Sequence, residues 1–94
     1  MHFQKQDLHY TYYEWDEDQV HMYTGQPSRR VFNKYDGNQV LFLINFYGSL
    51  SNRFTIAEGR QIEHRILTEL PGEIKSELSV YNWLRNTIFL EEAI

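Results

Sequence analysis

The side chains able to perform metal or acid–base chemistry are few and widely spaced. The chain contains four histidines and no cysteine. His9 and His21 are expected to share one face of a hairpin, but no third ligand accompanies them. Because a stable zinc-type site needs three or four protein ligands, we predict neither a bound metal nor another cofactor.

Catalytic arrangements of nucleophile and base are not recognisable either. Glu63 and His64 are neighbours on an expected helix, where consecutive side chains point about 100° apart. They are therefore expected on a solvated helix face rather than as an acid–base pair. Ser49 lies outside any Gly-x-Ser-x-Gly motif, and the five glycines are scattered singly instead of forming a phosphate-binding loop. The sequence therefore favours a protein without enzymatic activity.

The first half of the chain has the composition of β-structure. Aromatic and β-branched residues are frequent from position 8 to 15 and from 19 to 24, on either side of an acidic turn. A third strand at 29–35 and a fourth at 39–47 flank Asp36-Gly37, a dipeptide typical of a two-residue hairpin turn. We therefore expect two β-hairpins over residues 8–47, preceded by a flexible N-terminus at residues 1–7.

Helical periodicity follows in the second half, residues 55–90. Thr55 and Glu58 have the spacing of a capping box, and apolar residues recur every fourth position from Ile62. Pro71-Gly72 ends this helix, and a second apolar stripe starts near residue 73. The predicted fold is a single α+β domain of two layers, in which an antiparallel sheet of four or five strands carries two helices on one face.

The predicted fourth strand is apolar on both faces, which leaves one face without helices to cover it. Large exposed apolar faces usually mark interfaces, and tyrosine and tryptophan are enriched in binding hot spots. We therefore predict a non-enzymatic protein-interaction module that self-associates as a homodimer. Its candidate interface consists of Phe32, Leu41, Leu43, Tyr47, Tyr13, Trp15 and Tyr23.

Two alternative functions stay open. A ligand-binding domain or minor enzyme would hold a pocket between sheet and helices, lined by Tyr10, Tyr12, Met22, Trp83, His21 and His64. A single-stranded nucleic acid would bind alternating basic and aromatic side chains, here Arg29, Arg30, Lys34 and Tyr35. The net charge of −4 opposes binding to phosphate backbones, so nucleic acid is the disfavoured partner.

Composition narrows the class of protein further. The chain has 94 residues, 13 acidic against 9 basic side chains, and 16% aromatic residues. Small, acidic, cysteine-free regulatory or inhibitor proteins of mobile elements fit this composition. No run approaches the roughly 18 apolar residues of a membrane span, and the first residues lack the apolar region of a signal peptide. We therefore expect a cytoplasmic protein without membrane contact.

Overall fold

The computed structural model describes residues 3–16, 23, 25–50 and 54–92. Within these ranges the chain is mostly helical. The helices are a short 3₁₀ helix, η1 (Lys5–Asp7), and three α-helices, α1 (Gly37–Ser49), α2 (Ile56–Thr68) and α3 (Glu77–Glu92).

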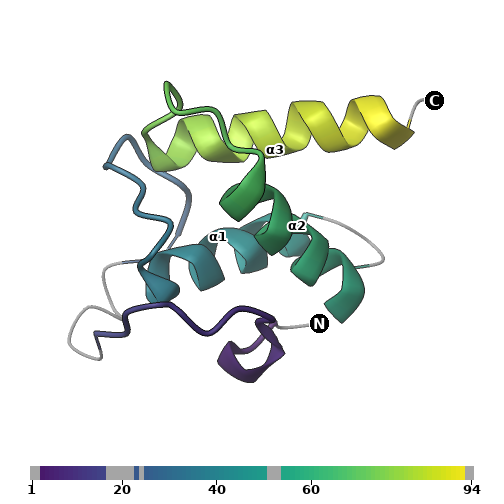
Figure 1. Ribbon diagram of the computed structural model, residues 1–94. Coiled ribbons are helices and arrows are strands. Elements are labelled where there is room, and N and C mark those ends of the chain that lie inside the picture. Colours follow the sequence, from purple (N-terminus) through teal and green to yellow (C-terminus); the bar gives the residue numbers. More distant parts are fainter. Residues whose placement is uncertain (1–2, 17–22, 24, 51–53, 93–94) are drawn as a thin grey trace.

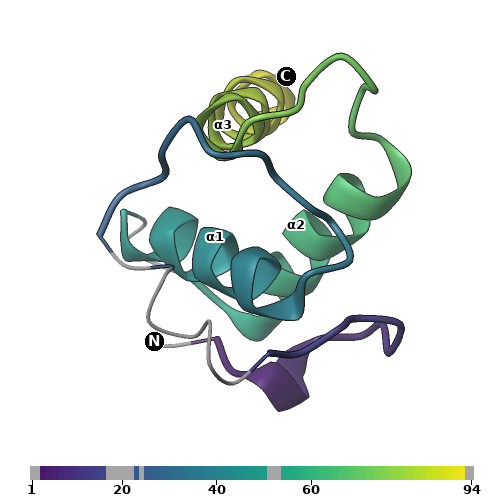
Figure 2. The ribbon, with the colours of Figure 1, turned by 90° about the vertical axis from the view of Figure 1, so that its left-hand side faces the viewer.

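Helix α1 lies at the centre of the fold and contacts both α2 and α3. Figures 1 and 2 show α3 on one side of the α1–α2 pair and the N-terminal segment, in purple, on the other. The segment before α1, residues 25–36, passes the start of α3 and then reaches the start of α1 (Figure 2). The non-helical first part of the chain therefore packs against the helices.

The predicted α+β fold with an antiparallel sheet is wrong. The described residues contain no β-strand, and their β-type pairing consists of isolated bridges that join Glu14 to Asp36 and Val31 to Ser76. The strand predicted at 39–47 lies inside α1, and the segments at 8–15 and 29–35 form no ladder. The strand predicted at 19–24 falls almost entirely outside the described residues.

Asp36-Gly37 starts a helix instead of turning a hairpin. The Asp36 carboxylate accepts hydrogen bonds from the backbone N–H groups of Asn38, at 3.0 Å, and Gln39, at 3.3 Å. These N–H groups belong to the first turn of α1, which has no partners within the helix. A type I′ turn needs positive φ at both central residues, and neither Asp36 nor Gly37 has it. The dipeptide therefore acts as an N-cap.

The apolar run that follows matches one face of a helix. Val40, Leu43 and Ile44 are completely buried, and their spacing of three and four residues places them together on α1. A short apolar run fits a buried strand or a buried helix equally well by periodicity. The cap at Asp36 decides between the two, because it satisfies a helix start.

The second half contains the helices α2 and α3, which pack on α1 rather than on a sheet. The Thr55 hydroxyl accepts a hydrogen bond from the Glu58 N–H at 3.1 Å, so it caps α2 as its spacing predicts. Helix α3 begins at Glu77, later than expected, where the Ser76 hydroxyl accepts from the Ser79 N–H at 3.1 Å. None of the helices in the described ranges is long and apolar enough to cross a membrane.

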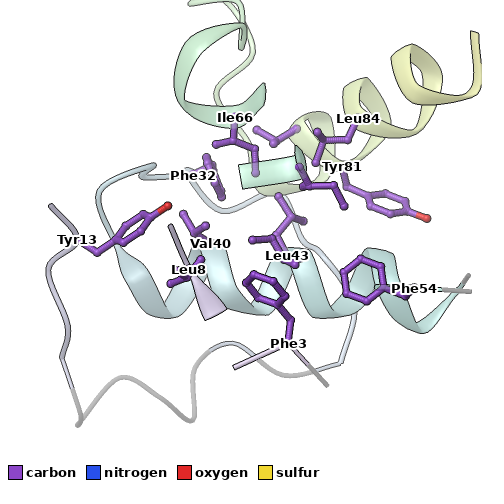
Figure 3. Packing of buried hydrophobic residues seen from close by; sticks show 13 residues of the cluster. Phe3, Leu8, Tyr13, Phe32, Val40, Leu43, Phe54, Ile66, Tyr81 and Leu84 are labelled. Carbon is purple, nitrogen blue, oxygen red and sulfur yellow. The ribbon is translucent and has the colours of Figure 1, made fainter. Parts of the chain in front are cut away.

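The core joins all three helices to the N-terminal segment (Figure 3). Phe3, which lies in the region expected to be flexible, is completely buried. Asn45 of α1 fixes its backbone, accepting from the Phe3 N–H and donating to the Phe3 carbonyl, both at 2.7 Å. The Phe3 ring lies over Gly59 of α2, where an added Cβ would stand 2.4 Å from the ring. A glycine inside this helix thus makes room for Phe3.

We predict that Gly59→Ala destabilises the protein. Alanine favours a helix by about 1 kcal/mol over glycine, but its methyl group would displace the Phe3 ring from the core. The expected loss is about 1–3 kcal/mol in the free energy of unfolding, measured by urea denaturation. Gly72→Ala is the control, because nothing lies within 4 Å of a Cβ added there. Equal stability of the two variants would contradict the packing of Phe3 on Gly59.

Candidate functional site

Two completely buried glutamates hold the non-helical segments onto the helices. Glu63 lies on α2 and Glu77 is the first residue of α3, and both side chains are 0% exposed. A carboxylate removed from water needs hydrogen-bond donors or a cation in exchange. The donors that each glutamate receives come from the chain before α1 and from α1 itself.

Glu63 anchors the segment from His9 to Tyr13. Its carboxylate accepts from the backbone N–H of His9 at 2.8 Å, the N–H of Tyr10 at 3.3 Å and the Tyr13 hydroxyl at 2.6 Å. Burial, followed by the hydrogen bond to Glu63, raises the pKa of Tyr13 above its ordinary value. The expectation of a solvated helix face is therefore wrong for Glu63, whereas His64 is exposed as expected.

The anchored segment presents a group of aromatic rings to solvent. The Tyr10 hydroxyl lies 2.8 Å from His64 Nδ1, and the Tyr12 ring centroid is 6.1 Å from that of Tyr10 and 5.2 Å from that of Tyr35. Tyr12 is 41% exposed and Tyr35 51% exposed. Partial burial, and then the neighbouring Tyr35, raise the pKa of Tyr12 to about 12. We call Tyr10, Tyr12, Tyr35 and His64 the tyrosine surface.

An open hollow of about 450 Å³ adjoins the tyrosine surface and shares Tyr10 with it. The indole of Trp15 lies against Gly37, where an added Cβ would stand 2.5 Å from the ring. The Lys5 ammonium lies 4.3 Å from the indole centroid. The hollow is lined by Lys5, Gln6, Leu8, Tyr10, Thr11 and Trp15.

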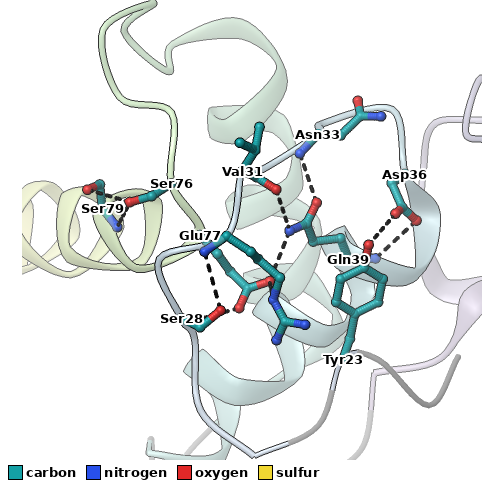
Figure 4. Close-up of polar contacts among 10 residues, drawn as sticks. Tyr23, Ser28, Val31, Asn33, Asp36, Gln39, Ser76, Glu77 and Ser79 are labelled. Carbon is teal, nitrogen blue, oxygen red and sulfur yellow. Dashed lines mark hydrogen bonds and ion pairs between the residues drawn. The ribbon is translucent and has the colours of Figure 1, made fainter. Parts of the chain in front are cut away.

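Glu77 fastens the second non-helical segment between α1 and α3 (Figure 4). Its carboxylate accepts from the Ser28 N–H at 2.9 Å and from Gln39 Nε2 at 3.0 Å, and it lies 3.0 Å from Arg30 Nε. Gln39, itself 1% exposed, also accepts from the Asn33 N–H at 2.8 Å. Segment 28–33 is thereby held by two buried side chains.

The basic residues of the predicted nucleic-acid patch have different surroundings in the fold. Arg30 is paired with the buried Glu77, and its guanidinium carbon lies 4.8 Å from the Tyr23 ring centroid. Lys34 Nζ lies 5.7 Å from the ring centroid of Tyr35, while Arg29 is exposed. One of the three cations is thus used to neutralise a carboxylate inside the fold.

Tyr23 also contributes to the start of α1. Its hydroxyl donates a hydrogen bond of 2.7 Å to the Asp36 carboxylate, the group that caps the helix (Figure 4). Burial, and then this hydrogen bond, raise the pKa of Tyr23 to about 12. The Tyr23 hydroxyl therefore helps to stabilise the start of α1.

The residues predicted as a dimer interface lie mainly within the chain's own core. Their predicted role depended on an exposed sheet face, which the described residues do not form. The three buried members are Phe32, Leu43 and Tyr13, and the partly buried members are Trp15, Tyr23, Leu41 and Tyr47.

Half of the predicted pocket residues come together, although not between a sheet and helices. Tyr10, Tyr12 and His64 meet on the tyrosine surface. Trp83 is elsewhere, on α3, with its ring centroid 5.6 Å from the guanidinium carbon of Arg65. His21 and Met22 lie outside the described residues.

Sequence reasoning missed Glu63, Glu77 and Gln39, which are three of the four buried polar side chains in the described residues. Glu63 could have been placed from periodicity, since it follows Gly59 by one helical turn and lies beside Ile62 on the buried face of α2. Glu77 and Gln39 carry no comparable signal, because their partners lie in an irregular segment.

The chain matches no protein-family model, no curated protein and no solved structure. Within the part of the chain that the structure describes, no three histidine, aspartate or glutamate side chains are grouped so as to hold a metal ion.

We predict that Glu63→Gln destabilises the protein by about 2–3 kcal/mol. Glutamine replaces one carboxylate oxygen by an amide that donates, so at least one of the three donors that meet at Glu63 loses its acceptor. Glu69→Gln is the control, because Glu69 is largely exposed and lies 3.9 Å from Arg65. We expect it to cost less than about 1 kcal/mol. Urea denaturation measures both, and equal losses would contradict an anchoring role for Glu63.

We predict that alkaline pH destabilises the fold through Tyr13. In the unfolded chain this tyrosine ionises near its ordinary pKa of 10.0, whereas the folded state raises that pKa. The folded protein then retains a proton that the unfolded chain loses, so its stability is complete below about pH 10. Above that pH the free energy of unfolding falls by about 1.4 kcal/mol per pH unit for one such group.

Urea denaturation between about pH 8 and pH 12 measures this slope. Tyr13→Phe should lower the stability at neutral pH and make the alkaline slope shallower. The slope should not vanish, because the pKa values of Tyr12 and Tyr23 are also raised, to about 12. An unchanged slope would show that Tyr13 is not the group responsible.

Proposed function

We propose that this chain is a protein-interaction module, without a catalytic role of its own, that binds a partner protein through the tyrosine surface. The observation that carries the proposal is the exposure of Tyr12, 41%, and Tyr35, 51%, on rings that contact each other. Tyrosine combines a large apolar ring with a hydrogen-bonding hydroxyl, and it is enriched in binding hot spots for that reason.

The exposed Tyr12 ring has several contacts within the chain itself. Tyr12 packs against Tyr13 with ring centroids 4.7 Å apart, and Tyr13 is tied to the buried Glu63. The Tyr12 hydroxyl also approaches the Lys34 carbonyl at 3.5 Å. Side chains that are fixed before binding lose less conformational entropy in the complex, so this arrangement favours recognition of a partner.

The homodimer stays a prediction. The exposed sheet face from which it was inferred is not formed by the described residues. Sedimentation equilibrium at micromolar concentration tests it, since a homodimer doubles the mass of the sedimenting species. A regulatory or inhibitor protein that acts by covering a partner's surface is the class that we propose. The tyrosine surface supports either a second copy or a different protein as the occupant, and we propose a different protein.

The proposal is tested with the double variant Tyr12→Ser plus Tyr35→Ser. We expect capture of the partner from an extract of the native host to fall at least about tenfold, because hot-spot tyrosines contribute about 2 kcal/mol or more. Quantitative mass spectrometry compares the captured proteins, and circular dichroism verifies that each variant is folded.

The matched control is Val31→Ser plus Leu50→Ser, which removes two exposed apolar side chains, 77% and 64% exposed, outside the tyrosine surface. Capture should persist with this control. Loss of the same partner in both double variants, or in neither, would contradict binding through the tyrosine surface.

A further inference from the structure

The described lining of the hollow contains a lysine. Lys5 is the one charged side chain among the six lining residues in the described part of the chain, whereas the whole chain carries 13 acidic and 9 basic residues. The nearby Asp7 directs its carboxylate to the backbone N–H of Gln4 at 2.9 Å. Among the described lining residues, a ligand in the hollow therefore meets the Lys5 ammonium and no carboxylate.

Trp15 positions this cation. The Lys5 ammonium stands 4.3 Å from the indole centroid, a cation–π distance. The indole is supported by Gly37, which has no side chain to push it away, and by the Tyr13 ring, whose centroid is 6.1 Å from that of Trp15. An ammonium group has three N–H donors, and contact with one ring face leaves donors for an anionic acceptor.

The remaining walls of the hollow are suited to an apolar group. Leu8, Tyr10 and Trp15 supply apolar surface, while Thr11 and Gln6 add a hydroxyl and an amide. The volume of about 450 Å³ lies within the usual range of binding sites, and its open shape admits a side chain that projects from a protein surface. The lining thus combines one ammonium with an apolar floor.

We propose that the hollow binds an acidic segment of the partner protein, in which an aspartate or glutamate adjoins an aromatic or aliphatic side chain. The carboxylate pairs with Lys5, and the apolar side chain rests on Trp15 and Leu8. This inference depends on the proposed function, because Tyr10 belongs to both the hollow and the tyrosine surface. A partner that covers the tyrosine surface extends across Tyr10 into the hollow.

The two tryptophans of the chain provide a direct test. Trp15 lines the hollow and Trp83 lies on α3, so a ¹⁵N-labelled protein gives one indole N–H signal at the site and one elsewhere. The probes are the peptide acetyl-Ser-Asp-Phe-Asp-Ser-amide and its neutral counterpart with asparagine in place of aspartate. We expect the acidic peptide to shift the Trp15 signal and leave that of Trp83 in place. The neutral peptide should bind at least about fivefold more weakly.

Two lysine variants separate the site from the general charge of the protein. Lys5→Gln should weaken binding of the acidic peptide about fivefold. Lys75→Gln is the matched control, because Lys75 is an exposed lysine in the loop before α3 and lies outside the lining of the hollow. The unchanged Trp83 signal reports that each variant is folded.

Three outcomes would overturn the inference: no shift of the Trp15 signal at millimolar peptide, equal binding of both peptides, or equal weakening by both lysine variants. None of them bears on the capture experiment with the tyrosine variants. If the hollow fails this test while the tyrosine double variant still loses its partner, the proposed function stands and only the chemistry assigned to the partner is wrong.

Discussion

The backbone N–H groups of His9 and Ser28 donate hydrogen bonds to buried carboxylates rather than to a neighbouring strand. An extended chain that packs against helices must satisfy its amide groups, since an unpaired buried N–H costs as much as a lost hydrogen bond. Here side chains of the helices supply the hydrogen-bond partners of these amide groups. Glu63, Glu77 and the amides of Gln39 and Asn45 bond to the backbone of the first thirty-three residues. The rest of the structure depends on these side chains, which make the hydrogen bonds that a neighbouring strand would make in a sheet.

That constraint determines which side chains reach solvent. Once Glu63 holds the backbone at His9 and Tyr10 and the hydroxyl of Tyr13, the intervening Tyr12 is directed outward, where it meets Tyr35. The exposed ring is thus connected to a buried carboxylate through one neighbouring ring. The position of the exposed Tyr12 ring thus depends on the hydrogen bonds of Glu63 beneath it.

The same constraint explains which parts of the fold could be predicted. Helices α2 and α3 were predictable because their signals are local: Thr55 caps the first, and regularly spaced apolar residues define the buried face of each. For α1 the local signals were ambiguous, since Asp36-Gly37 fits a hairpin turn or a helix cap and the apolar run after it fits either structure. The non-helical segments before α1 carry no such local signal. Their backbone N–H groups bond to glutamates more than forty residues away in the sequence.

The candidate site was predictable in its residues more than in its geometry. Tyr10, Tyr12 and His64 were expected to meet, and they do, but α2 brings them together rather than a sheet. Net charge argued against binding to phosphate backbones, but net charge is an average over the chain and does not describe the surroundings of a single side chain. Lys5 and Trp15 are ten residues apart in the sequence, and their side chains meet where the indole packs on Gly37. A residue first interpreted as a turn glycine thus has a second role, since the absence of its side chain leaves room for the tryptophan that positions the lysine.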